Sequence, residues 1–233
     1  MIHSQTEEKG FAEVRGTLYR LLSQCFFQAT EDLASSILNG SLVQTFKLTV
    51  GMLGDEKADQ AIALIEEHGK KCQGFSLPSI CSELNVEYNR LFVGPGHLPS
   101  PPYESVNKTK NEENKEGLVM GDATLDAKRQ YLSAGITLPE DFTDLPDHIG
   151  VELDFMSCLC FEEASMLQKG NGEGATEVRK KQYEFLSSHL DNWITVFCEA
   201  VCTSTHSEFY QGIAQVSEIW VHFDKEELDL MVE

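Results

Sequence analysis

The chain has 233 residues, 41% of them hydrophobic, which allows a substantial core in one large domain or two small ones. The longest uninterrupted apolar run is five residues, so the sequence contains no candidate transmembrane helix. A formal net charge of −20 disfavours nucleic acid and anionic membranes, because phosphate groups are bound by clustered Lys and Arg. A basic partner is favoured, and the alternative is that the acidic excess only keeps the protein soluble.

The N-terminus and the cysteines both favour a cytoplasmic location. The first residues, MIHSQTEEKGF, have neither a basic nor an apolar region, so we expect no export signal. The seven cysteines are odd in number and lie mostly within apolar patterns. They are therefore predicted to be reduced thiols that pack as small hydrophobic side chains, and not a disulfide framework.

The hydrophobic periodicity is helical from the start of the chain. Apolar residues at i, i+3 and i+4 predict a long amphipathic helix over 11–25. Thr30 is expected to cap a short helix that Gly40 ends, and a third helix follows from Ser41. Asp55 is expected to cap a fourth helix.

A fifth helix, expected to begin at Ser79, leads into the stretch LFVGPGHLPSPPYESV at 91–106. Its prolines fix φ and remove backbone donors, which excludes helix and sheet ladders. The stretch nevertheless keeps large apolar side chains that a merely solvated loop would not need. It is therefore predicted to form a stiff, apolar wall.

The second half of the chain also has helical periodicity. The segment 107–117 contains no apolar side chain and predicts a mobile loop or a hinge. Helices are predicted after Asp122, from about Asp147, where the helix is expected to be central and buried, and beyond a flexible linker at 169–174. With no convincing strand and no repeat of fixed period, the sequence predicts an all-α fold of about nine or ten helices in a single domain over 1–233.

The common catalytic signatures are missing: the sequence has no Walker loop, dinucleotide fingerprint, helical His-Glu-x-x-His or paired Cys-x-x-Cys. Cys198, Cys202 and His206 fall at i, i+4 and i+8, a spacing that suggests metal ligands. On a straight helix, however, they would spread over about 12 Å, too far for one ion. Buried thiols on a core face are the favoured interpretation, and we expect no metal and no cofactor.

The motif LPDHIGVE at 145–152 is the second candidate for chemistry. Pro146 makes the preceding residue extended, so Asp147 is expected to cap a helix with His148 in its first turn and Glu152 one turn further on. Asp147 and His148 could act as general acid and base, but no nucleophile or metal ligand is near them in sequence. A helix cap beside a surface histidine is therefore favoured from spacing alone.

Four ordered blocks resemble the TorD/DmsD family of redox-enzyme maturation chaperones, to which the nitrate-reductase assembly chaperones are related. The blocks are EYNRLFVGPGHLPSPPYESV (87–106), GLVMGDATL (117–125), LPDHIGVELDFM (145–156) and FLSSHLDNWITVF (185–197). The resemblance covers most of the chain and implies a TorD-like helical fold. It also implies a cytoplasmic, non-enzymatic chaperone that binds the twin-arginine signal peptide and the apo-form of a molybdenum-cofactor oxidoreductase during cofactor insertion and before export.

The resemblance places peptide binding on eight positions of this sequence: Leu91, Phe92, Pro101, Pro102, Tyr103, Gly121, Asp147 and His148. A twin-arginine signal offers two guanidinium groups and an apolar segment, so its receptor needs carboxylates beside an apolar surface. Glu152 and Asp147 are the expected carboxylates. The chain departs from the family pattern at Gly96 and Tyr103, where some relatives carry Trp, so client choice is expected to differ.

Two other classes of function stay open from the sequence. The first is a small enzyme or nucleotide-dependent assembly factor that uses Asp147 and His148, with 107–117 as a lid. The second is a structural helical subunit with an exposed apolar groove. A loop at 107–117 would also permit helix exchange between two copies, so a monomer and a domain-swapped dimer are both compatible with the sequence.

Overall fold

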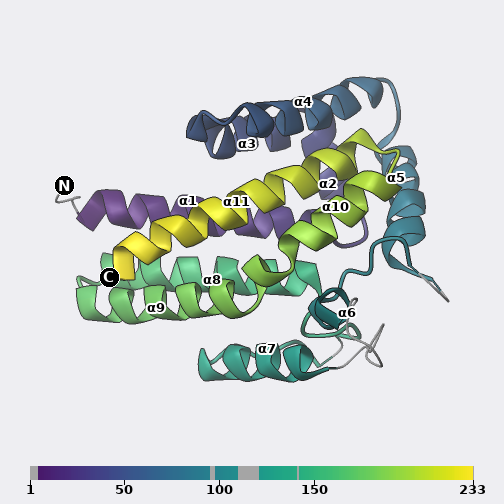
Figure 1. Cartoon of the computed structure of the whole chain (residues 1–233). Coiled ribbons are helices and arrows are strands. Elements are labelled where there is room, and N and C mark those ends of the chain that lie inside the picture. The colour runs from purple at the N-terminus through teal and green to yellow at the C-terminus, as the bar shows by residue number, and fades with distance from the viewer. Residues whose placement is uncertain (1–4, 95–97, 110–120, 141, 233) are drawn as a thin grey trace. The chain divides into compact units, whose positions relative to one another are not determined.

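A computed structural model describes residues 5–94, 98–109, 121–140 and 142–232 (Figure 1). These residues form eleven α-helices and two 3-10 helices, and the only β-pairing within them is an isolated bridge between Tyr103 and His148. The predicted all-α fold is confirmed, with one or two more helices than the nine or ten expected. No helix in the described ranges is both long and apolar enough to cross a bilayer.

The chain divides into two compact units that alternate along the sequence. The first comprises 1–23, 103–193 and 221–233, and the second comprises 24–102 and 194–220. The single domain that the sequence predicts over 1–233 stays a prediction. The first and last helices, α1 (Gln5–Cys25) and α11 (Glu208–Val232), each contribute residues to both units.

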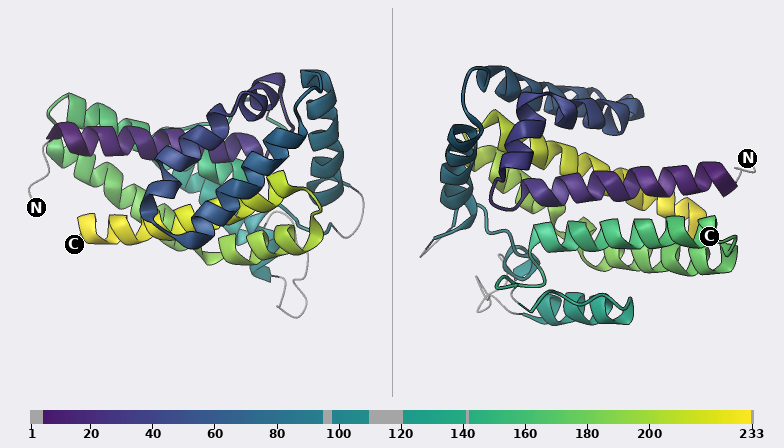
Figure 2. Two further views of the ribbon diagram at one scale, coloured as in Figure 1. Left: turned by 90° about the horizontal axis from the view of Figure 1, so that it is seen from above. Right: turned by 180° about the vertical axis from the view of Figure 1, so that it is seen from behind.

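The first unit is built around a long buried helix. Besides parts of α1 and α11 it contains α6 (Glu104–Thr109), α7 (Asp122–Ser133), α8 (Ile149–Gln168), α9 (Gly172–Ser188) and the 3-10 helix η2 (Leu190–Asn192). Thirteen of the twenty residues of α8 are buried, which confirms the predicted central helix. Figures 1 and 2 show α9 returning alongside α8, and the two helices pack against each other.

Two predicted loops of the first unit are shorter than expected. The linker at 169–174 is a tight turn, because Gly170 takes a φ of +70° and the Asn171 side chain caps α9 by accepting the Gly174 N–H at 2.9 Å. Residues 107–109 extend α6, where the Asn107 amide donates to the carbonyl of Tyr103 at 2.9 Å. The part of 107–117 from residue 110 onward lies outside the described residues.

The second unit contains α2 (Glu31–Leu38), α3 (Ser41–Leu48), the 3-10 helix η1 (Val50–Leu53), α4 (Glu56–Lys71), α5 (Leu77–Phe92), α10 (Ile194–Ser204) and the first part of α11. Thr30 and Asp55 cap α2 and α4 by accepting N–H groups of the first turn, as the sequence predicts. The predicted start of α5 at Ser79 is wrong. The hydroxyl of Ser76 accepts the Ser79 N–H, and a proline fits the first turn because it needs no backbone donor there.

A buried ionic network ties together helices of the first unit. The guanidinium of Arg15 on α1 is 1% exposed and donates to Asp224 on α11 at 2.9 Å and to Glu163 on α8 at 3.0 Å. It also donates to the Gln182 amide oxygen on α9 at 2.6 Å, and the hydroxyl of Tyr19 donates to Asp224 at 2.8 Å. Every partner of this buried cation is a hydrogen-bond acceptor, as burial of a charge requires.

Candidate functional site

The candidate site lies in the first unit, where the end of the proline-rich stretch meets the N-terminus of α8. Tyr103 and His148 pair in the isolated antiparallel bridge, and the N–H of Glu104 donates to the carbonyl of Asp147 at 3.0 Å. The rings of Tyr103 and His148 meet edge to face, with centroids 5.6 Å apart. The fold therefore brings together three of the residues predicted from the sequence, Tyr103, Asp147 and His148.

His148, and not Asp147, caps α8. The backbone of His148 is extended, and its Nδ1 accepts the N–H of Gly150 at 3.0 Å. The carboxylate of Asp147 instead accepts the N–H of Ser105 in the first turn of α6, at 2.9 Å. The predicted capping role of Asp147 in α8 is wrong because this side chain serves a different helix. Both side chains are buried, so His148 is not the surface histidine expected from spacing.

The environment of His148 keeps its imidazole neutral near neutral pH. Burial lowers the pKa of His148 to about 4, against the opposing effect of the Asp144 and Asp147 carboxylates. A neutral ring is also what the capping bond requires, since Nδ1 must carry a lone pair to accept from Gly150.

Asp144 supplies the accessible carboxylate of the site. Its side chain is 33% exposed, its Oδ1 accepts the Tyr103 hydroxyl at 2.9 Å, and its Oδ2 lies 3.9 Å from Nε2 of His148. The same residue lines a cavity of about 320 Å³ whose other walls combine apolar side chains with the polar residues Lys128, Tyr131 and Thr137. Those walls comprise Lys128, Tyr131, Leu132, Ile136, Thr137, Leu138, Pro139, Phe142 and Pro146. A hollow with several apolar walls and a carboxylate at its edge suits a ligand that is both apolar and cationic.

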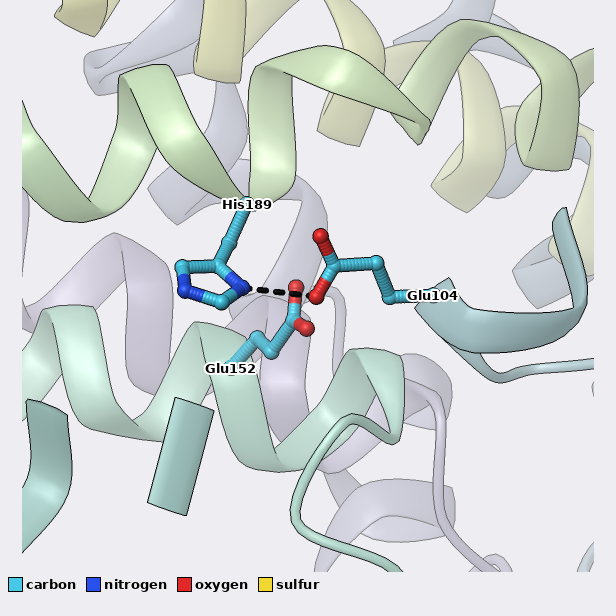
Figure 3. A group of neighbouring side chains, drawn as sticks. All are labelled: Glu104, Glu152 and His189. Carbon is cyan, nitrogen blue, oxygen red and sulfur yellow. Dashed lines mark hydrogen bonds and ion pairs between the residues drawn. The ribbon is translucent and has the colours of Figure 1, made fainter. Parts of the chain in front are cut away.

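A second group of polar side chains is buried near Tyr103 and the first turns of α8. Glu104 at the start of α6, Glu152 on α8 and His189 after α9 are all buried and point toward one another (Figure 3). Nδ1 of His189 lies 2.6 Å from Oε2 of Glu104, and the indole N–H of Trp193 donates to Oε2 of Glu152 at 3.0 Å. The ammonium of Lys108 forms an ion pair with the other oxygen of Glu104.

The two buried carboxyl groups differ in their pKa values. Burial raises the pKa of Glu152 well above its usual value, and the nearby charge of Glu104 raises it further. Burial acts on Glu104 in the same direction, but hydrogen bonds and charge from His189 and Lys108 outweigh it and lower its pKa. The cluster therefore favours one ionised and one protonated carboxyl group.

Glu104, Glu152 and His189 are also the residues that could hold a metal ion. One ligand atom from each lies within 4.8 Å of the others, and no other such group of His, Cys, Asp and Glu occurs in the described residues. Cys198, Cys202 and His206, the possible metal ligands considered from the sequence, do not form such a group. Cys198 is buried in α10, whereas His206 is exposed and lies beyond the end of that helix.

Leu91 and Phe92, which were also predicted for the site, do not belong to the unit that contains it. Leu91 and Phe92 belong to the second unit, where they are 0% and 2% exposed. The ring of Phe92 packs among other buried aromatic rings of that unit, those of Phe26, Tyr88, Phe197 and Tyr210, with centroids 5.3 to 6.3 Å away. Their contacts are those of a hydrophobic core.

The two prolines and the glycine predicted for the site have different surroundings. Pro101 is half-buried and Pro102 is buried, and both belong to the second unit. Gly121, in the first unit, precedes α7 as its N-cap without a side-chain cap, and a Cβ at this position would lie 3.5 Å from Cβ of Ser105. Gly121 thus lies next to α6, beside the segment that carries Tyr103 and Glu104.

Asp144, Glu104 and His189 are the site residues that sequence reasoning missed. Asp144 lies directly before the LPDH motif, and this proximity to a candidate motif could have indicated that it belongs to the site. Glu104 follows the Pro-Pro-Tyr element, and His189 lies within the fourth resemblance block. Nothing in their spacing pairs the last two, because 85 positions separate them.

Comparison with known proteins places the chain in the TorD family. The chain belongs to the nitrate reductase delta subunit family, whose model matches residues 78–199, just over half of the sequence. Similar relatives include the chaperone protein TorD of Shewanella pealeana, with 24% identity over 93% of this chain and 90% of the relative. The TorD chaperone of Shewanella sp. strain ANA-3 is 27% identical, over 92% of this chain and 94% of its own.

A solved structure is also similar to this chain. It is the crystal structure of a putative redox enzyme maturation protein from Archaeoglobus fulgidus, 21% identical, covering 92% of this chain and 93% of its own, with a TM-score of 0.43.

Proposed function

We propose that this protein is a cytoplasmic, non-enzymatic chaperone for a molybdenum-cofactor oxidoreductase. It binds the twin-arginine signal peptide and the apo-form of that enzyme while the cofactor is inserted and before export. Family membership supports the chaperone role. The observation that carries peptide binding is the carboxylate of Asp144, 33% exposed, at the edge of a cavity of about 320 Å³ with several apolar walls.

The chemistry of the peptide matches this surface. A guanidinium group binds a carboxylate through charge-assisted hydrogen bonds, and the following apolar segment gains from burial against Leu132, Leu138 and Phe142. The net charge of −20 attracts a doubly cationic peptide over longer distances and makes its binding sensitive to salt.

The residues predicted from the sequence take two roles in this proposal. Tyr103 contacts Asp144 directly and is itself half-exposed, so it can touch the peptide. Asp147, His148 and Glu152 are 0% exposed and hold the α6 and α8 segments in place behind it. Gly121 adjoins α6, where it keeps space beside Ser105.

A direct role of the second unit in peptide binding stays a prediction. Leu91, Phe92, Pro101 and Pro102 would have to contact the client there, and Phe92 is only 2% exposed. Contact with Phe92 therefore requires that its aromatic cluster opens, for example when the apo-enzyme binds.

The enzyme alternative based on Asp147 and His148 has less support than a chaperone. A general base must reach the proton that it removes. Both side chains are sealed from solvent, and Nδ1 of His148 is used as a helix cap.

Calorimetric titration with a synthetic twin-arginine peptide, and with its Lys-Lys variant, tests the proposed site. Asp144→Asn removes the charge of the acceptor, and we expect about 10- to 100-fold weaker binding, the range for loss of a hydrogen bond between charged groups. Asp229→Asn is the matched control, since Asp229 is an exposed carboxylate on α11 and should leave affinity unchanged. Equal affinity of wild type and Asp144→Asn, at low and high salt, would exclude Asp144 as the acceptor.

A further inference from the structure

The three side chains of the buried cluster come from three elements that are distant in sequence. Glu104 opens α6, Glu152 lies on α8, and His189 directly follows α9. Figure 3 shows the two carboxyl groups and the imidazole converging on a common point. One ligand atom of each lies within 4.8 Å of the others, and Nδ1 of His189 is 2.6 Å from Oε2 of Glu104.

Each of these side chains also has a second polar atom that is held from outside the cluster. The ammonium of Lys108 pairs with Oε1 of Glu104. The indole of Trp193 donates to Oε2 of Glu152 at 3.0 Å. In metal sites, partners of this kind orient the ligands and fix the tautomer of a ligating histidine.

The imidazole of His189 has the outer partner that a metal-binding histidine normally has. Its Nε2 lies 3.3 Å from Oδ2 of Asp126 and 3.0 Å from the amide nitrogen of Gln130. In the metal-free protein the 2.6 Å contact between Nδ1 and Oε2 of Glu104 needs a proton between the two atoms, and a metal ion would replace that proton. An Nε2–H directed at the Asp126 carboxylate would then leave the lone pair of Nδ1 for the ion.

Two carboxyl oxygens of the cluster accept no hydrogen bond within the described part of the chain, Oε1 of Glu104 and Oε1 of Glu152, and the first of them is paired with the ammonium of Lys108. Oε1 of Glu152 is buried, and the whole side chain is 0% exposed. A buried carboxyl oxygen without a partner is costly unless a proton or a cation satisfies it. This oxygen is a separate indication that the cluster can accept a ligand.

We propose that Glu104, Glu152 and His189 bind one divalent transition-metal ion of the zinc type, through Oε2, Oε1 and Nδ1. Carboxylate oxygen and imidazole nitrogen suit Zn²⁺, Co²⁺ and Mn²⁺, and two carboxylates balance the charge of the ion. Ligands about 2.1 Å from a tetrahedral ion lie about 3.4 Å apart. Nδ1 of His189 and Oε2 of Glu104, now 2.6 Å apart, would therefore separate by about 0.8 Å, and no pair of ligand atoms, all within 4.8 Å of one another, would need to approach by more than about 1.4 Å.

Bound metal would brace the segment that begins at Tyr103. It would tie the first turn of α6 to α8 and to the end of α9, all within the first unit. In the metal-free protein, Lys108 and a proton on Glu152 can neutralise the same charges, so the fold does not depend on the ion. The cluster lies close to the surface at Asp126, which adjoins His189 and whose side chain is 43% exposed.

Metal titration of the chelator-treated full chain tests the proposal. Co²⁺ and Zn²⁺ are the probes, and visible absorption of Co²⁺ distinguishes oxygen and nitrogen ligands from thiolates, which add an intense charge-transfer band. We expect one bound equivalent without that band. Glu152→Gln keeps the shape and an acceptor for Trp193, and should reduce affinity by at least about tenfold while thermal stability of the metal-free protein stays the same.

Two further variants complete the test. His189→Gln should also weaken binding, and the double variant Cys202→Ser, His206→Asn should bind as tightly as wild type, because its residues lie outside the cluster. The proposal is overturned if the wild type binds neither ion, if Glu152→Gln binds as tightly as wild type, or if only the cysteine variant loses binding.

Discussion

Acidification is expected to destabilise the protein through His148. Burial lowers the pKa of this side chain to about 4, although the carboxylates of Asp144 and Asp147 act in the opposite direction. In the unfolded chain a histidine has a pKa of about 6.5, so the unfolded state takes up a proton first as pH falls. The stability that depends on a neutral His148 is therefore complete above about pH 6.5 and is lost between about pH 6.5 and 4.

The size of the effect follows from the difference between the two pKa values. A difference of about 2.5 units corresponds to about 3.4 kcal/mol when the titration is complete. Between pH 7 and pH 4.5 the linkage relation gives a loss of about 2 kcal/mol in the free energy of unfolding. Solvent screening does not reduce this value much, because His148 is 0% exposed.

Urea unfolding of the wild type and of His148→Asn, at pH 7 and at pH 4.5, measures how much stability depends on a neutral His148. Asparagine can still accept the N–H of Gly150 as an N-cap but does not titrate, so the wild type should lose about 2 kcal/mol more than the variant. His206→Asn removes an exposed histidine and should behave as the wild type does. If the wild type and His148→Asn lose the same stability on acidification, the neutral, buried state of His148 is refuted.

Three other substitutions test the packing of the two units. Arg15→Met leaves the buried carboxylate of Asp224 without its cation, while Glu163 keeps its ion pair with Arg179. The substitution should cost about 3–5 kcal/mol in urea unfolding, and an unchanged midpoint would contradict the buried network. A hydrogen bond from Arg90 is the chief reason that the pKa of Glu87 is lowered to about 2. Glu87→Gln should therefore cost about 1–2 kcal/mol in the free energy of unfolding at pH 7. The variant should also lack the loss of stability that the wild type shows as Glu87 is protonated between about pH 4.5 and 2. Gly212→Ala would place a Cβ 2.6 Å from the carbonyl oxygen of Ala61, so thermal melts should show a loss of about 1–3 kcal/mol, and Gly10→Ala, which meets no atom, should show none.

Helices were predictable from the sequence because burial repeats along them with a helical period. The apolar positions predicted for α8 are buried, and the caps Thr30 and Asp55 were assigned correctly. In the stripe predicted for α1, Leu18 and Cys25 are buried but Val14 is 42% exposed. The starts of α5 and α8 were not assigned correctly, because several polar side chains lie near each helix start. Which of them reaches a free N–H depends on backbone angles that neighbouring elements determine.

The candidate site was only partly predictable, for a different reason. Leu91 and Phe92 lie at the edge of a proline-rich stretch, and an apolar residue there is compatible with an exposed wall or with a core. The structure places both in an aromatic core of the second unit. The contact between Glu104 and His189 joins residues 85 positions apart, and no local period encodes such a pair.

Three of the four resemblance blocks have a physical connection inside the first unit. Glu104 comes from the first block, Glu152 from the third, and His189 and Trp193 from the fourth, and these side chains interact in the interior. Buried polar groups stabilise a fold only as a complete set, since removing one partner leaves the others desolvated and unpaired. Loss of one of these residues would therefore leave its partners unpaired in the interior, which ties the stability of each block to the others.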